Sequence, residues 1–289
     1  MKSQIPRVAA IHDLSCFGRC ALTVIIPTLS AMGIQTVPVP TALLSTHTGG
    51  FTDMSFLDLH DEMKRIKEHF LSMDMKFDAI YTGFLGSEAQ IDTVTDFIKT
   101  FGDENCKIFV DPVMGDDGEL YSTYTKELML GMRRLCHGAH VITPNLTEAC
   151  FLTDTDYPDT HKMNLDEIKI LARGLCERLY GEYGADVILT GLSFDGKIAT
   201  GTLSGGEFRL SVSEHVGRNY PGTGDIFASV ALGRMLSGAD VPTAAEAAAE
   251  FTREVIAYSE GFGLPVRDGV VLEPMLGRLC RNEIATLSR

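Results

Sequence analysis

A glycine-rich segment in front of an apolar helical pattern carries the clearest chemical signal in this sequence. The segment reads Gly222-Thr223-Gly224-Asp225, and mostly apolar residues follow it. Glycines let backbone N–H groups approach an anion closely, and the first turn of a helix adds unpaired donors and partial positive charge. Together they predict a site for a phosphoryl group, with Asp225 placed to accept a proton from an attacking alcohol. An ordinary glycine turn before an acidic helix start is the structural alternative.

Carboxylate and amide side chains follow two further apolar runs. Asp111 ends the run at 107–110, and Asp116 lies in the glycine-bearing loop after it. Oxygen ligands at a strand end suit Mg²⁺, which keeps part of its water shell and sits beside substrate phosphates. Asn145 and Glu148 stand three residues apart at the start of a predicted helix and share one face. They fit a helix N-cap with a capping-box acid or, beside the other two features, a water-mediated metal shell.

Alternating strand and helix patterns must position these residues. Short apolar runs typical of buried parallel strands occur at 8–12, 36–39, 79–82, 107–110, 139–142 and 186–189. Helical patterns occupy 21–32, 56–73, 87–101, 123–135, 146–153 and 165–180. This alternation predicts an α/β fold with a central, mostly parallel sheet flanked by helices on both faces.

The pattern changes after residue 189. Residues 197–203 and 207–212 flank Ser204-Gly205-Gly206 and predict a small antiparallel hairpin at the edge of the sheet. Helices are expected at 224–236 and 243–259. No linker or repeat interrupts the chain, so we expect residues 1–289 to form one domain.

The ends of the predicted strands indicate where a ligand would bind. In open α/β sheets, ligands bind outside the carboxyl ends of the strands. Small and polar residues follow nearly every predicted strand in this chain: His12-Asp13, 45–50, Gly83-Phe84, Asp111-Pro112, 143–145 and Thr190-Gly191. The sequence therefore predicts a polar site at this edge of the sheet.

Composition narrows the class of protein. The 289 residues are 45% hydrophobic and 22% charged, which excludes a disordered or low-complexity chain. The net charge of −14 argues against nucleic acid or an anionic membrane as the main partner. Residues 20–52 carry no charged side chain, but three prolines break this stretch, which we expect to be a helix, a strand and a pocket-lining loop rather than a membrane span.

The cysteines and the N-terminus bear on the compartment. Seven cysteines, an odd number without a C-x-x-C pair, are best explained as buried free thiols in a reducing cytosol. The apolar run near the N-terminus is too short for a signal peptide. We therefore expect a cytoplasmic protein.

Several common enzyme motifs are absent from the sequence. There is no G-x-x-x-x-G-K-[ST] loop, no H-E-x-x-H, no G-x-S-x-G, and no G-x-G-x-x-G after the first predicted strand. A Walker-type NTPase, a zinc hydrolase of the H-E-x-x-H type, an α/β-hydrolase and a Rossmann dehydrogenase are therefore disfavoured.

Taken in order along the chain, the motifs resemble one known family. They are Phe17-Gly18, the string THTG at 46–49, TGF at 82–84, DPVMGD at 111–116, TPN at 143–145 with Glu148, and GTGD at 222–225. The chain resembles the ribokinase-like small-molecule kinases and, within them, the vitamin B6 (pyridoxal) kinases. The resemblance implies a ribokinase-like fold and ATP-dependent phosphorylation of a hydroxymethyl group on a pyridine ring. It also implies Mg²⁺ as cofactor and ATP and a B6 vitamer as substrates. By analogy it suggests a homodimer, and it leaves dependence on a monovalent cation such as K⁺ open.

The resemblance also implies roles for individual residues, position by position. Asp225 matches the catalytic base, and Gly222, Thr223 and Gly224 match the anion hole for the transferred phosphoryl group. Asp116, Asn145 and Glu148 match the metal shell, whereas Asp111, Thr190 and Tyr220 match positions beside the nucleotide. The vitamin is expected to meet polar Asp13 and Thr48, apolar Leu44 and Phe84, and Tyr121 on a loop over the substrate.

Three of these positions depart from the family pattern. Many relatives carry serine in place of Asp13, an aromatic residue in place of Leu44, and tyrosine in place of Phe84. A carboxylate at position 13 favours a protonated ring nitrogen or an amine. A hydroxymethylpyrimidine kinase of thiamine synthesis therefore stays open as an alternative. A vitamin- or nucleotide-binding module without turnover is the alternative outside the enzymes.

Overall fold

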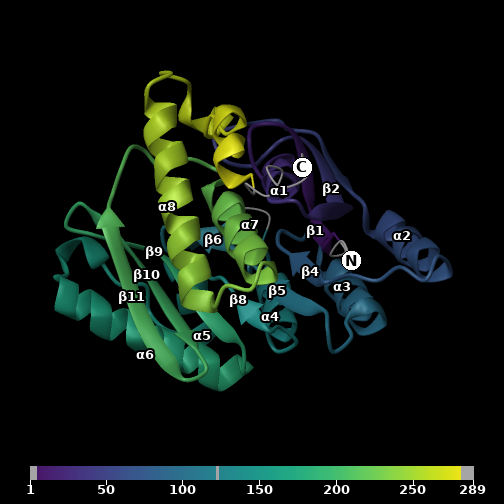
Figure 1. Ribbon diagram of the computed structural model, residues 1–289, viewed down its shortest axis with the longest axis horizontal. Helices are drawn as coiled ribbons and strands as arrows, with labels where there is room; N and C mark the ends of the chain where they lie inside the picture. The colour runs from purple at the N-terminus through teal and green to yellow at the C-terminus, as the bar shows by residue number, and fades with distance from the viewer. Residues whose placement is uncertain (1–4, 122–123, 281–289) are drawn as a thin grey trace, which may run out of the picture.

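A nine-stranded sheet forms the centre of the computed structural model, which describes residues 5–121 and 124–280 (Figure 1). Its strands, in spatial order, are β11 (Glu207–Glu214), β10 (Lys197–Ser204), β9 (Asp186–Phe194), β8 (Val141–Ile142), β5 (Lys107–Val110), β4 (Ala79–Thr82), β1 (Arg7–Phe17), β2 (Gln35–Thr46) and β3 (Phe56–Asp58). From β9 to β2 all neighbours are parallel, and both edges are antiparallel. A separate two-stranded sheet pairs β6 (Gly115–Asp116) with β7 (Glu119–Leu120).

Helices cover both faces of the sheet, as the alternating pattern predicts. One apolar core packs the first face against α2 (His60–Ser72), α3 (Glu88–Phe101), α4 (Lys126–Cys136), α5 (Leu146–Thr153) and α6 (Leu165–Tyr183). A second core packs the opposite face against α1 (Leu22–Ala31), α7 (Thr223–Leu236), α8 (Val241–Glu260) and the 3-10 turn η3 (Glu273–Leu279). Two further 3-10 turns are η1 (Thr160–Lys162) and η2 (Val266–Asp268). In Figure 1, α7 and α8 lie side by side over the sheet.

The parallel sheet, the helices on both faces and the edge hairpin β10–β11 confirm the predicted fold class. Strands β4 and β5 and helix α5 have the predicted bounds. Strands β1 and β2 are longer than predicted and extend beyond the end of β4, which pairs β1 only as far as Ile11. Between His12 and Leu14 their pairing shifts by one residue.

The prediction of one helix over 56–73 is wrong at its start. Residues 56–58 form strand β3, because Phe56 and Leu57 pair with Leu44 and Leu43 of β2. Helix α2 begins only at His60, whose N–H donates to the Asp58 carboxylate at 2.7 Å. The helical prediction rests on the local pattern of apolar residues, which carries no information about pairing with a strand more than ten residues away in the sequence.

The seven cysteines are all free thiols. Five are buried, but Cys16 and Cys280 are exposed, so the expectation that all of them are buried is wrong at these two positions. None of the helices in the described part of the chain is both long and apolar enough to cross a membrane.

Candidate active site

A cavity of about 140 Å³ opens beyond the carboxyl ends of β5 and β8, between the middle of β9 and the start of α7. Its lining brings together eight of the predicted site residues, from segments far apart in the sequence: Asp111, Tyr121, Asn145, Glu148, Thr190, Gly222, Gly224 and Asp225. The site therefore lies at the edge of the sheet that the sequence predicts.

The start of α7 has the geometry of an anion hole. Gly222 is left-handed, with φ 79°, and a Cβ at this position would overlap the carbonyl oxygen of Arg19. The first intrahelical bond runs from Ile226 N–H to Gly222 O at 3.1 Å, so the three preceding amides have no partner within the helix. Beside Gly224 a Cβ would meet nothing within 4 Å. Gly222, Gly224 and Asp225 line the cavity, so the start of α7 and the positive end of its dipole lie at the cavity wall.

Thr223 contributes its backbone rather than its side chain. Its hydroxyl donates to the carbonyl oxygen of Tyr220 at 2.9 Å. This bond holds the turn that leads into α7, and Thr223 itself is not part of the described cavity lining.

Asp225 is held by a backbone donor from a distant segment. The N–H of Ala21 donates to Asp225 Oδ2 at 2.8 Å. Burial raises the pKa of Asp225 to about 7; the Ala21 bond opposes this shift, and the negative charge of Asp13 adds to it. A carboxyl group with a pKa near 7 and a fixed orientation suits a general base.

Two more carboxyl groups lie deep in the cavity. Asp111 is 7% exposed and Glu148 only 3%. Burial raises the pKa of both groups; repulsion from Asp225 adds to the shift at Asp111, and repulsion from Asp111 adds to that at Glu148. Among the described residues no lysine, arginine or histidine lines this cavity. The described lining therefore holds no positively charged side chain to balance these carboxylates, and a bound cation would supply the missing positive charge.

The predicted capping box at Asn145 and Glu148 is present, and both side chains also line the cavity, where a metal shell is the other interpretation. Asn145 Oδ1 accepts from Glu148 N–H at 2.9 Å, and Glu148 Oε2 accepts from Asn145 N–H at 2.8 Å. Glu148 Oε1 also accepts from Met114 N–H at 3.1 Å, and Asn145 Nδ2 donates to Gly115 O at 2.9 Å. These bonds fix both side chains in the wall of the cavity, which each of them lines.

The fit to Mg²⁺ rests on this donor set. Within residues 5–121 and 124–280 no three His, Cys, Asp or Glu side chains form a ready-made metal cage. Asp116 is exposed, accepts from Asp117 N–H at 3.0 Å and lies outside the cavity lining. Mg²⁺ usually binds through few direct protein ligands, and waters and phosphates complete its coordination shell. The oxygen-rich, uncompensated lining thus fits the ion, while Asp116 as a ligand stays a prediction.

The residues expected to bind the vitamin are only partly gathered. Tyr121 lines the cavity, whereas Asp13, Leu44, Thr48 and Phe84 are not part of its described lining. Asp13 is 7% exposed and accepts from the Ser15 hydroxyl at 2.8 Å; burial raises its pKa to about 6. Its negative charge also contributes to the raised pKa of Asp225.

His12, next to Asp13, faces the interior instead of the site. It is fully buried and its ring lies 4.2 Å from the ring of Tyr81, centroid to centroid. Burial lowers the pKa of His12 to about 3, so it is neutral near pH 7. A Cβ at Gly83 would overlap this ring, which explains the glycine there.

Tyr220 is buried but belongs to a structural cluster. Its hydroxyl donates to Glu260 at 3.0 Å and accepts from Arg218 at 2.7 Å, and Tyr220 is not part of the lining of the cavity described above. Its proposed place beside the nucleotide therefore rests on its neighbours, Arg218 and Asn219, which do line the second cavity.

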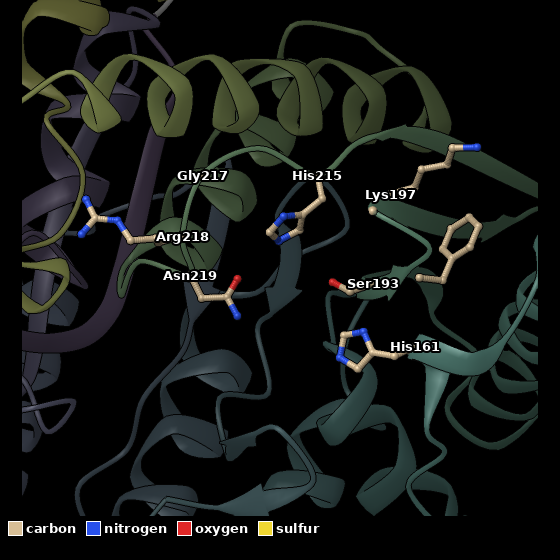
Figure 2. A pocket seen from close by; sticks show the side chains of 9 residues that line it. His161, Ser193, Lys197, His215, Gly217, Arg218 and Asn219 are labelled. Atoms are coloured by element: carbon tan, nitrogen blue, oxygen red, sulfur yellow. The ribbon is translucent and has the colours of Figure 1, made fainter.

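That second cavity, of about 390 Å³, is not predicted by any motif (Figure 2). Its polar lining comes from η1, from β9 and β10, and from the loop before α7: His161, Ser193, Lys197, His215, Arg218 and Asn219. The two cavities share segments, since β9 supplies Thr190 to the first and Ser193 to the second, and the loop before α7 runs from Gly217 in one to Gly222 in the other.

The chain is similar to several known proteins. The family model described as phosphomethylpyrimidine kinase matches residues 10–268. A crystal structure from Bacteroides thetaiotaomicron, described as a phosphomethylpyrimidine kinase and determined with pyridoxal, is 39% identical; the match covers 96% of each chain with a TM-score of 0.88. Pyridoxal kinase from Lactobacillus plantarum is 28% identical over 96% of this chain and 97% of that one, with a TM-score of 0.85. The pyridoxine/pyridoxal/pyridoxamine kinase of Bordetella avium is 26% identical over 86% of this chain and 84% of that protein.

Proposed function

This chain belongs to the phosphomethylpyrimidine kinase family, and we propose that it transfers the γ-phosphoryl group of ATP to the 5′-hydroxymethyl group of a B6 vitamer. One observation carries the proposal: the free amides of the first turn of α7 and the carboxylate of Asp225 face the same cavity. Phosphoryl transfer needs this combination of fixed donors and a positioned base. The pyridoxal in the 39% identical structure supports a B6 vitamer as acceptor.

The two cavities suggest how ATP lies. The nucleoside end fits the larger cavity, where the rings of His161 and His215 and the amide of Asn219 supply stacking and hydrogen-bonding groups. The phosphates then pass Thr190 and reach the amides that follow Gly222. Lys197 and Arg218 add positive charge at the nucleoside end of this path.

Glu148 and Asn145, with Asp111 beside them and Asp116 from the adjoining hairpin, would hold Mg²⁺. The ion, when bound, neutralises charge on the β- and γ-phosphates. The chain's own contribution is to hold Glu148 through two backbone amides, so that its carboxylate keeps one orientation as the ion binds and leaves.

Asp225 takes the proton of the acceptor hydroxyl as the new P–O bond forms. Its orientation comes from the Ala21 N–H, and its pKa of about 7 means that a large fraction is ionised near neutral pH. The amides of α7 stabilise the charge that develops on the transferred group.

Asp13 bears on the choice of acceptor. A buried carboxylate that already accepts one hydroxyl donor attracts a cationic or N–H-bearing edge of the ring. This favours vitamers with a protonated ring nitrogen or an amine. For the same reason, hydroxymethylpyrimidine is the second candidate for the acceptor.

A coupled assay of ADP release with four alcohols tests the proposal. We expect turnover with pyridoxal, pyridoxamine and pyridoxine that exceeds turnover with hydroxymethylpyrimidine. The reverse order would move the chain to the thiamine branch of the family. Binding of vitamer and ATP without ADP release would indicate a module without turnover.

Three expectations complete the proposal. The exposed edge strand β11 supports a homodimer, which sedimentation or light scattering tests. The free thiols support a cytoplasmic location, which fractionation of the native host tests. Dependence on K⁺ is tested by ADP release with K⁺ replaced by a bulky organic cation.

A further inference from the structure

The segment 265–269, which we call the strap, bridges the loop after β2 and the loop after β1. It contains η2 and contacts the loop after β2 on one side and the loop after β1 on the other. The first loop carries Thr48, expected to bind the vitamer, and the second leads to Ala21, which orients Asp225.

His47 makes the contact between the strap and the loop after β2. It is 8% exposed; its Nδ1 accepts from Gly49 N–H at 3.0 Å, and its Nε2 lies 2.7 Å from the carbonyl oxygen of Arg267. Since Nδ1 is an acceptor, Nε2 carries the proton and donates to Arg267. A Cβ at Gly18 would overlap this ring, so the loop after β1 closes on it from the other side.

Arg267 strengthens the same contact. Its guanidinium lies over the ring of Phe51 at 5.0 Å and donates to Gly50 O at 3.4 Å. The Phe51 ring in turn lies 5.0 Å from the ring of His47. The loop 47–51 is therefore held to the strap by two hydrogen bonds and by ring contacts.

The other side of the strap holds the backbone next to the anion hole. Arg19 N–H donates to Asp268 O at 3.2 Å. A Cβ at Gly269 would come within 2.9 Å of the Arg19 backbone, and one at Gly222 would overlap its carbonyl oxygen. The backbone of Arg19 is thus packed between the strap and the first residue of the anion hole.

We propose that His47 is a positioning residue that fixes the acceptor loop 47–51 to the strap and, through Arg19, sets its place relative to the anion hole. The inference rests on the proposed function, because it takes this loop as a wall of the vitamer site. His47 touches neither phosphate nor base; it acts through Thr48 and the strap.

Kinetics of His47→Phe test this role. Phenylalanine keeps a ring of similar size but removes both hydrogen bonds and leaves Arg267 O unpaired. We expect the KM for pyridoxal to rise about tenfold, with kcat and the KM for ATP within about twofold of wild type. His47→Gln, which can donate to one of the two partners, should recover part of the loss. His60→Phe is the matched control, because the His60 ring bonds the Thr93 hydroxyl of α3 at 2.9 Å and neither residue is part of the two cavity linings described above.

Hydrogen exchange at the Gly49 amide gives a readout that does not depend on turnover. We expect exchange of this amide to be at least tenfold faster in His47→Phe than in wild type and unchanged in His60→Phe. A similar fall in kcat and rise in both KM values, together with a lower melting temperature, would mean that His47 has a purely structural role. An unchanged KM for pyridoxal in a folded variant would overturn the inference. Failure of the wild type to release ADP would count against the proposed function, whereas the exchange measurement would still test the contact.

Gly269→Ala tests the second half of the connection. A Cβ there presses on the Arg19 backbone, so kcat should fall at least tenfold although residue 269 touches no substrate. Normal kcat in the folded variant would show that the strap and the anion hole are not connected through Arg19.

Discussion

Replacement of Asp225 by asparagine separates the chemical role of this residue from its structural cost. Asparagine keeps the shape and an oxygen that can accept from Ala21 N–H, so the contact at 2.8 Å is retained. It cannot take a proton from the acceptor hydroxyl. Turnover should therefore fall by about 10²-fold or more, while the Kd for ATP stays within a few-fold of wild type.

The stability of the same variant should move in the opposite direction. The pKa of Asp225 rises from 3.8 to about 7, which means that the folded protein disfavours the ionised form. At about 1.4 kcal/mol per tenfold change in proton affinity, the cost of ionised Asp225 is at most about 4 kcal/mol. This is an upper bound, because part of the carboxylate faces the open cavity.

The sign of the pH dependence follows from the raised pKa. Between pH 4 and 7 the folded state binds more protons than the unfolded state, so stability falls as pH rises through this range. Asp225→Asn removes the penalty. The variant should be more stable than wild type by up to about 4 kcal/mol at pH 8 and by under half of that at pH 5.

Urea unfolding at both pH values and ADP release at pH 8 measure these effects. Asp74→Asn is the control, an exposed aspartate far from the cavity whose positive φ of 50° asparagine also tolerates. It should change neither turnover nor the pH dependence of stability. Near-normal turnover in Asp225→Asn would end the assignment of the base, and a stability change independent of pH would refute the burial argument.

Three further variants probe the other parts of the site. Gly222→Ala should lower kcat by about 10²-fold in ADP-release assays. Gly238→Ala is the control and should leave kcat unchanged, because Gly238 also has a positive φ but a Cβ there would meet nothing within 4 Å. Equal kcat values for the two variants would contradict the anion hole. Glu148→Gln should raise the Mg²⁺ concentration for half-maximal rate several-fold, and an unchanged titration curve would remove Glu148 from the metal shell. Asp13→Asn removes a negative charge that raises the pKa of Asp225, so the acidic limb of kcat/KM should move to lower pH; an unmoved limb would show that the two carboxyl groups do not interact.

Local signals explain what the sequence predicted well. Helix α5 begins at the expected residue because Asn145 and Glu148 close a capping box within four residues. Strands β4 and β5 are short, mostly apolar runs inside a parallel sheet, and the apolar pattern alone predicts their bounds. Asp111 and Asn145 come together because the parallel strands β5 and β8 end at one edge, as a topological rule predicts. The same rule does not bring the expected vitamer residues into the described lining, namely Asp13, Leu44, Thr48 and Phe84.

Long-range partners explain what was missed. All three residues of β3 are exposed and acquire their conformation from β2, so their own pattern carries no strand signal. Ala21 adopts φ 48° and donates to Asp225, yet nothing about an alanine predicts this role. The second cavity draws on residues from His161 to Asn219 without a shared motif. Only the folded chain shows that these residues are neighbours.

A crystal structure with Mg²⁺, a non-hydrolysable ATP analogue and pyridoxal tests the central claim most directly. The account predicts terminal phosphate oxygens within about 3 Å of the amides that follow Gly222, with the pyridoxal hydroxymethyl oxygen between that phosphate and the Asp225 carboxylate. A terminal phosphate bound away from residues 222–225, or a hydroxymethyl group turned away from Asp225, would contradict it.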